Sequence, residues 1–119
     1  MILAAFLLVG QAISLAPPLD WTSLPRLSLA SGSSMSPQLS EFAQNEVRDG
    51  RCSLGDRSTL DLAVLVAENG RVRRIVPRAI DCPSVEQFAA GVVLRAARDR
   101  IRPPATATWY VTTIALLQP

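Results

Sequence analysis

The amino-acid sequence predicts an α+β domain of two layers, in which a three-stranded antiparallel sheet packs on two helices in the order helix–β-hairpin–helix–strand. Three patterns in the 119 residues indicate this fold. An apolar run leads into an Asn-Gly turn, apolar stripes at helical spacing precede and follow that hairpin, and β-branched residues dominate the last segment. The chain length suits one small domain with appendages, and we place the domain at residues 36–119.

The first helix is expected to begin at Pro37, with Ser36 as its N-cap, and to end at Gly50. Four apolar residues at helical spacing form one face of this helix: Leu39, Phe42, Ala43 and Val47. Such a face usually packs against a core, so we assign it no ligand.

The hairpin is the clearest β signal in the chain. Residues 60–67 are almost continuously apolar, and the Asn-Gly turn that follows tolerates positive φ. In the returning strand, Val72 and Ile75 are three residues apart, which breaks the alternation expected of a strand. A bulge near Arg73-Arg74 would restore the alternation and leave the arginines facing water.

The second helix is expected to begin at Ser84, because Ser84 and Gln87 have the spacing of a capping box, and to stop before Pro103-Pro104. The last strand is expected within residues 106–117, which are rich in β-branched and aromatic residues. Its odd-numbered residues from Trp109 onward should share one face of the sheet.

The N-terminal residues 1–19 are apolar at first and then rich in small residues and proline, which is typical of a signal peptide or an N-terminal membrane anchor. We therefore expect export to the periplasm, with the protein either secreted or tethered to the inner membrane by this segment. Membrane contact is expected only through the segment, if it is not cleaved. Residues 20–35 have no sustained period and should form a linker in which Trp21 tucks against the domain.

Export suggests a role for the two cysteines, Cys52 and Cys82. An even pair in an oxidising compartment is most simply used as a disulfide. It would close a loop of about 30 residues and stabilise the fold by on the order of 3–4 kcal/mol. The alternative, in a cytosolic protein, is two unrelated buried thiols.

The composition argues against an enzyme. All twelve basic residues are arginine, so lysine nucleophiles and histidine acid–base chemistry are absent. Two cysteines and scattered carboxylates do not make a zinc or calcium site. We therefore predict no catalytic residue, no metal and no cofactor. A net charge of +2 also gives no reason to expect a nucleic-acid partner.

Two motifs and the final strand resemble a known family. The stretch "GRVRRIVP", from Gly70 to Pro77, matches a turn of the form G-x-V-x-x-hydrophobic-x-hydrophobic, with proline in the last position. The run "RDRIRPP", residues 98–104, matches a basic and apolar helix end before proline, and "TWYVTTIAL" follows as the last strand. Residues 36–117 are thus similar to the C-terminal domain of TonB-type energy transducers, although Ser36-Pro37 replaces the family's usual Tyr-Pro.

The resemblance implies a non-enzymatic periplasmic protein-interaction module. In that family the edge of the last strand pairs with an extended peptide of an outer-membrane transporter. A working transducer also needs a long Pro-rich spacer, whereas residues 20–35 contain only Pro25, so we expect a small relative without that spacer. The resemblance places partner contact on five residues of the last strand: Trp109, Tyr110, Val111, Thr112 and Thr113.

Two alternatives remain open from the residues alone. The sheet edge could instead pair with a second copy, which would make the chain a self-associating structural or assembly protein of the cell envelope, for example a homodimer. A third hypothesis uses four arginines of one short stretch to bind an anion or nucleic acid: Arg71, Arg73, Arg74 and Arg78. This stretch lacks interleaved aromatic residues, which disfavours the nucleic-acid version.

Overall fold

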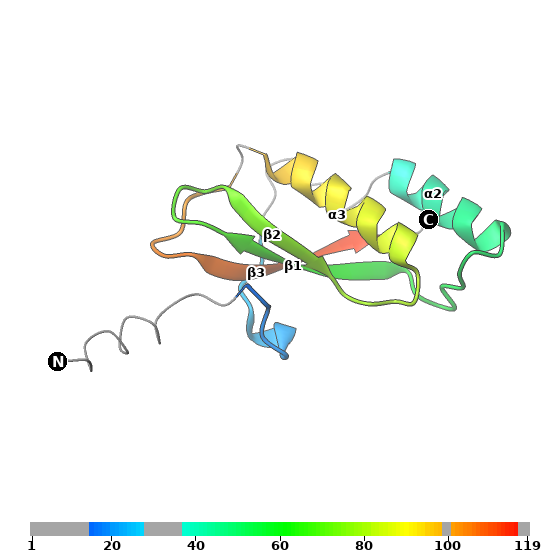
Figure 1. The fold of residues 1–119 in the computed structure, drawn as a ribbon, viewed down its shortest axis with the longest axis horizontal. Helices are drawn as coiled ribbons and strands as arrows, with labels where there is room; N and C mark the ends of the chain where they lie inside the picture. The colour runs from blue at the N-terminus through cyan, green and yellow to red at the C-terminus, as the bar shows by residue number, and fades with distance from the viewer. Residues whose placement is uncertain (1–14, 28–36, 99–100, 117–119) are drawn as a thin grey trace.

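The computed structural model describes residues 15–27, 37–98 and 101–116 of the chain. Its elements in chain order are the 3-10 helix η1 (Trp21–Ser23), α2 (Pro37–Arg48), β1 (Thr59–Val66), β2 (Val72–Pro77), α3 (Pro83–Ala97) and β3 (Thr108–Ala115). The strands form an antiparallel sheet in the order β2-β1-β3. Both α-helices cover one face of the sheet and η1 lies on the opposite side (Figure 1). The predicted α+β fold is confirmed.

Parts of the N-terminal predictions fall on residues outside this description. Most of the expected leader, residue Ser36 and the second half of the expected linker are among them. Across the described ranges, none of the helices has the length and apolar character that a membrane crossing requires.

The turn between β1 and β2 depends on Gly70. Its φ is +83°, and its N–H donates to the carbonyl of Ala67 at 2.8 Å, which closes the turn. A Cβ at this position would lie 3.1 Å from the carbonyl oxygen of Ile101 and 3.2 Å from Cγ of Pro103. Glycine is therefore required here both by the backbone conformation and by the close approach of the α3–β3 connection.

A bulge in β2 restores the alternation that the sequence breaks. Leu65 pairs with Arg74 and the next residue, Val66, pairs with Val72, so Arg73 is the extra residue. As a result, Val72 and Ile75 both pack against the core on the helix side, while the arginines of the stretch are exposed. The predicted bulge is confirmed.

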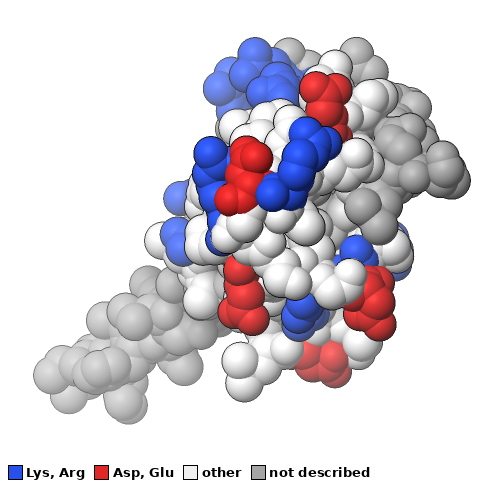
Figure 2. All heavy atoms as spheres, turned by 90° about the vertical axis from the view of Figure 1, so that its right-hand side faces the viewer, with Lys and Arg blue, Asp and Glu red and all other residues white. Residues whose placement is uncertain are grey.

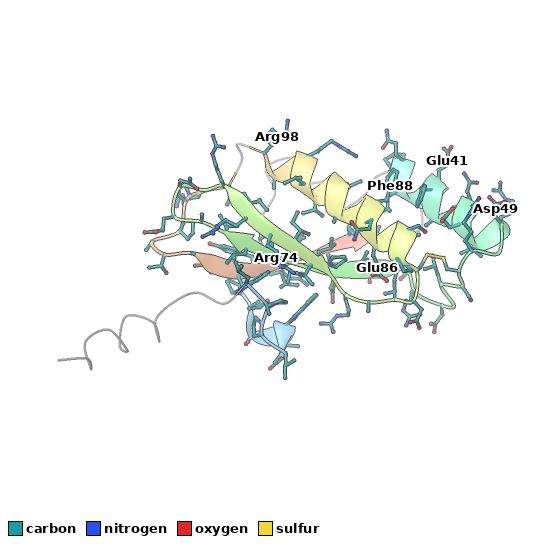
Figure 3. All side chains as sticks on the ribbon, viewed as in Figure 1. Glu41, Asp49, Arg74, Glu86, Phe88 and Arg98 are labelled. Atoms are coloured by element: carbon teal, nitrogen blue, oxygen red, sulfur yellow. A yellow bond between two sulfur atoms is a disulfide. The ribbon has the colours of Figure 1, made fainter. Side chains whose placement is uncertain are left out.

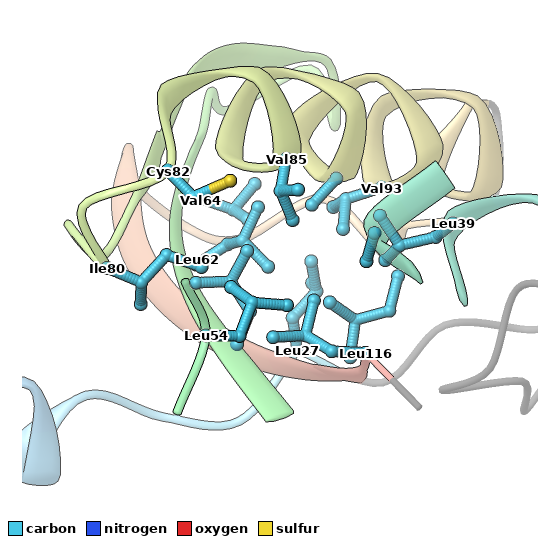
Figure 4. Close-up of a cluster of buried hydrophobic side chains, with 14 of the residues drawn as sticks. Leu27, Leu39, Leu54, Leu62, Val64, Ile80, Cys82, Val85, Val93 and Leu116 are labelled. Carbon is cyan, nitrogen blue, oxygen red and sulfur yellow. The ribbon is translucent and has the colours of Figure 1, made fainter. Parts of the chain in front are cut away.

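The main core lies between the sheet and the two helices (Figure 4). Its side chains come from alternate positions of β1 and β3, from both helices and from the loops that flank them. The fully covered members include Leu39, Leu60, Leu62, Val64, Val85, Val93 and Leu116. Burying one such side chain stabilises the fold by about 1.5–3 kcal/mol, so this cluster dominates the stability of the domain.

The helix α2 ends near Gly50, as expected, and buries Leu39 and Ala43. Phe42 stacks on Phe88 of α3, with 4.6 Å between ring centroids. The expected apolar face is wrong at its C-terminal end, because the Val47 side chain remains 43% exposed. The last turns of α2 instead bury a polar residue, Glu46.

The start of α3 also differs from the prediction. Cys82, rather than Ser84, is the N-cap, and Pro83 occupies the first helical position. The predicted capping box with Gln87 is therefore not formed. Its role is taken by Glu86, whose carboxylate accepts the N–H groups of Ile80 at 3.0 Å and Cys82 at 3.3 Å. A carboxylate in the first turn also interacts favourably with the helix dipole.

The expected disulfide between Cys52 and Cys82 is present, with 5.4 Å between the Cα atoms. Beside it, the buried carboxylate of Glu46 accepts a hydrogen bond from Ser84 at 2.5 Å and pairs with Arg51 at 2.8 Å. The disulfide and this carboxylate together tie the end of α2 to the start of α3. Disulfides are typical of oxidising, extracytoplasmic compartments.

Candidate functional site

The five residues predicted to contact a partner lie in β3, at one edge of the sheet. Trp109 and Val111 are buried on the side of the sheet that η1 covers, whereas Tyr110 and Thr112 face the helices. Thr113 is half-buried. Since most of these side chains are covered, an outside partner at this edge would meet mainly the backbone.

The middle of the β3 edge is paired within the chain. The N–H of Val111 donates to the carbonyl of Pro25 at 3.0 Å, and the N–H of Leu27 donates to the carbonyl of Val111 at 2.9 Å. Arg26 and Val111 thereby form a parallel bridge. Residues 20–27, which we expected to be linker, are thus part of the folded domain.

The same segment covers the face of the sheet opposite the helices. Trp21 and Leu24 pack against a second apolar cluster made by Ala63, Leu65 and Trp109. Trp21 therefore tucks against the domain, as its isolated position in a polar segment suggested. Both tryptophans of the chain lie in this cluster, so tryptophan fluorescence reports on it.

A row of polar contacts fixes the segment over this face. The guanidinium of Arg78 lies 4.2 Å from the ring centroid of Trp21 and 4.0 Å from the carboxylate of Asp61. Asp61 accepts a hydrogen bond from Thr113 at 2.6 Å, and the Thr113 hydroxyl accepts one from Arg26 at 2.9 Å. The row joins three strands and the segment, which indicates a structural role for these charges.

The turn η1 is capped by Asp20. Its carboxylate accepts hydrogen bonds from the hydroxyl of Thr22 at 2.5 Å and from the N–H of Thr22 at 3.0 Å. The hydrogen bond from the Thr22 hydroxyl is the main reason why the pKa of Asp20 lies below its ordinary value, and the hydrogen bond from the Thr22 N–H lowers it further. The stability of this cap should therefore depend on pH in the acid range.

Two carboxylates that the fold covers, those of Glu46 and Glu86, have structural partners. Glu46 and Glu86 bind groups at the helix ends, as described above. No group of three or more metal-ligating side chains occurs among the described residues. On the face shown in Figure 2, acidic and basic side chains are interspersed.

The other edge of the sheet is the outer side of β2. The N–H of Arg78 donates to the carbonyl of Asp61 at 2.9 Å, so the backbone N–H and C=O of Arg78 point toward β1. By the alternation of an antiparallel ladder, the N–H and C=O of Ile75 and the C=O of Pro77 point away from β1. Pro77 occupies a position where the missing N–H costs no ladder bond.

A groove runs between this edge and α3. It consists of two adjoining hollows of about 550 and 410 Å³ that share Val72 and Leu94. Its apolar lining includes Ile75 and Ala90, and four arginines also line it: Arg71, Arg73, Arg74 and Arg98. Figure 3 shows Arg74 on the sheet and Arg98 at the C-terminal end of α3. The sequence patterns did not predict this groove, although the arginine-rich stretch forms one of its walls.

Comparisons of the chain with protein-family models, with curated proteins and with solved structures found no match. The resemblance to the TonB C-terminal domain therefore rests on the sequence motifs and on the order of the elements.

Proposed function

We propose that the chain is a non-enzymatic interaction module of the cell envelope, similar to the TonB C-terminal domain, that binds an extended segment of a partner protein along an edge of its sheet. One observation carries the proposal. The β3 edge already pairs with an extended segment through two main-chain hydrogen bonds at Val111, of 3.0 and 2.9 Å. Such pairing gives affinity without requiring a particular side-chain set, which is the basis of strand addition.

The proposed compartment is the periplasm. The disulfide between Cys52 and Cys82 and the apolar, small-residue character of residues 1–19 both support it. The partner class follows from the resemblance and is a protein with an extended segment, such as an outer-membrane transporter. This function needs no cofactor, because its affinity comes from backbone hydrogen bonds and apolar contacts.

Each edge offers one central residue whose backbone groups point outward, Val111 on β3 and Ile75 on β2. At β3, a partner could reach Val111 only after residues 25–27 move away, since they occupy its N–H and C=O. At β2, no strand of the described residues pairs with the outer side. The two edges can therefore be tested separately by removing one outward N–H at a time.

The test is a selection of random peptides by display on the disulfide-bonded protein, followed by binding measurements on Val111→Pro and Ile75→Pro. The controls Val111→Ala and Ile75→Ala shorten the side chains but keep the N–H groups. We expect selected peptides to bind the wild type and both alanine variants, and to lose at least about fivefold in affinity on one proline variant, because a hydrogen bond is lost. Peptide binding that neither proline weakens would refute strand addition.

A further inference from the structure

We infer that the groove between β2 and α3 binds an acidic extended segment of a partner protein, which adds to β2 as a fourth strand. The inference rests on the proposed function and specifies its edge and its ligand. Three features of the groove support it: the unpaired backbone edge, the apolar wall of α3 and an excess of positive charge.

The backbone edge supplies the hydrogen bonds. The outward N–H and C=O of Ile75 are in the middle of β2, which spans Val72–Pro77. No other strand of the described residues covers them, whereas the equivalent groups of Val111 on β3 are already bonded. Of the two edges, β2 thus accepts an added strand without displacing any paired segment of the described residues.

The wall of the groove supplies an apolar surface for alternate side chains of that strand. Leu94 is 44% exposed, one of few large apolar side chains that the described residues leave so open. Gly91 lies on the same wall, and a Cβ there would meet only the guanidinium of Arg95, at 3.9 Å. Packing therefore does not explain a glycine in the middle of a helix, where it weakens the helix. Its effect is to leave the groove open.

The positive charge of the groove favours an acidic partner segment. Four arginines are among the residues that line the two hollows, and none of the lining residues is acidic. Arg74 pairs with Leu65 of the η1-face cluster, so its side chain points to that face of the sheet and only its backbone borders the groove. No described carboxylate forms an ion pair with Arg71, Arg73 or Arg98. An acidic segment would compensate this charge, and alternating side chains would place its carboxylates and its apolar residues on opposite faces.

The same features disfavour a second copy of the chain as occupant. Like charges on an edge strand are one of the devices by which proteins prevent edge-to-edge association of identical chains. Two β2 strands brought together would oppose arginine to arginine, which is destabilising. The edge is thus selective for acidic strands and is closed to its own copy.

The probe is a fluorescein-labelled peptide of alternating Glu and Val, with an alternating Lys and Val peptide as its charge-reversed counterpart. Binding to the full chain is followed by anisotropy. We expect the acidic peptide to bind and the basic one not to bind. We expect Arg73→Glu with Arg98→Glu to weaken binding of the acidic peptide by at least about twofold, since each exposed pair contributes about 1.4- to fivefold. The matched control is Arg48→Glu with Arg57→Glu, which changes the net charge equally away from the groove.

Two further pairs test the geometry of the groove. Gly91→Leu fills the groove and should abolish binding, whereas Gly91→Ala should leave it nearly intact. Ile75→Pro should weaken binding at least about fivefold, and Ile75→Ala much less, because only the proline removes the outward N–H.

The outcomes separate this inference from the proposed function. If acidic peptides bind but respond to Val111→Pro and not to Ile75→Pro, strand addition stands and the groove is the wrong site. If no peptide of either charge binds, and display yields none, both fail.

Equal binding of a single-stranded oligonucleotide that Arg73→Glu with Arg98→Glu weakens would overturn the peptide as ligand. A dimer in sedimentation that Ile75→Pro dissociates would assign the groove to a second copy and overturn the inference.

Discussion

The N–H of Leu27 donates to the carbonyl of Val111 at 2.9 Å. This bond joins a residue before α2 to a residue of the last strand, so nearly the whole sequence of the domain lies between them. It places the segment before α2 on the edge of the last strand. The β3 edge, where the sequence motifs predict contact with a partner, is therefore occupied at Val111 by the protein's own chain.

Leu27→Pro should release the segment from β3. Proline removes the N–H that bonds Val111, whereas Leu27→Ala removes the same packing but keeps the hydrogen bond. We expect the proline variant to be less stable than the alanine variant by about 0.5–1.5 kcal/mol. Its tryptophan emission should also shift to the red, as Trp21 becomes exposed. Equal stability and equal emission of the two variants would show that the bond does not hold the segment.

Arg78→Ala should weaken the docking of Trp21. The guanidinium lies 4.2 Å from the ring centroid, a geometry worth about 0.5–1 kcal/mol at an exposed site. A double-mutant cycle with Trp21→Leu isolates this contribution from the distant ion pair of Arg78 with Asp61. Urea unfolding of the four proteins measures it, and a coupling energy of zero would contradict the contact.

Replacing both cysteines with serine should destabilise the domain by on the order of 3–4 kcal/mol, because the disulfide closes a loop with a sequence separation of 30 residues. Without the disulfide, the end of α2 would be connected to the start of α3 mainly by the hydrogen bond between Glu46 and Ser84. Thermal unfolding with and without reductant on the wild type is the matched measurement. A wild type that is equally stable when reduced would contradict the role assigned to the bond.

The docked segment should weaken in acid. The pKa of Asp20 is lowered in the folded state, mainly by the hydrogen bond from the Thr22 side chain. A lowered folded-state pKa means that the contribution is complete above the unfolded value of 3.8 and is lost as pH falls through the folded one. Tryptophan emission should therefore shift to the red as pH falls below about 4. Asp20→Asn should remove this transition, and a variant with an unchanged acid transition would assign it to another group.

The elements could be predicted because their signals are local. The Asn-Gly turn, the spacing of Val72 and Ile75 and the apolar stripes of the helices each depend on neighbouring residues. The docked segment could not be predicted in this way. Arg26 and Thr113, for example, are separated by 87 residues, and their contact leaves no periodic pattern in either segment.

For the candidate site, too, the local features could be predicted and the tertiary contacts could not. The arginines of "NGRVRRIVPR" could be placed on the outer face of β2 from the bulge alone. Their relation to Leu94 and Gly91 depends on how α3 lies over the sheet, which is a property of tertiary packing. The start of α3 shows the same limit, because the N-cap is Cys82, which is bonded to Cys52 from a distant part of the sequence, and not the Ser84 that the local spacing favours.

The most direct test of sheet-edge binding is amide hydrogen exchange, measured by NMR on the disulfide-bonded protein with and without the alternating Glu and Val peptide. In the free protein the N–H of Ile75 points out of the sheet and should exchange fast, whereas that of Val111 is bonded to Pro25. With saturating peptide, we predict that the Ile75 amide becomes protected at least tenfold, which corresponds to about 1.4 kcal/mol. Unchanged exchange at Ile75, with the peptide bound, would contradict strand addition at β2.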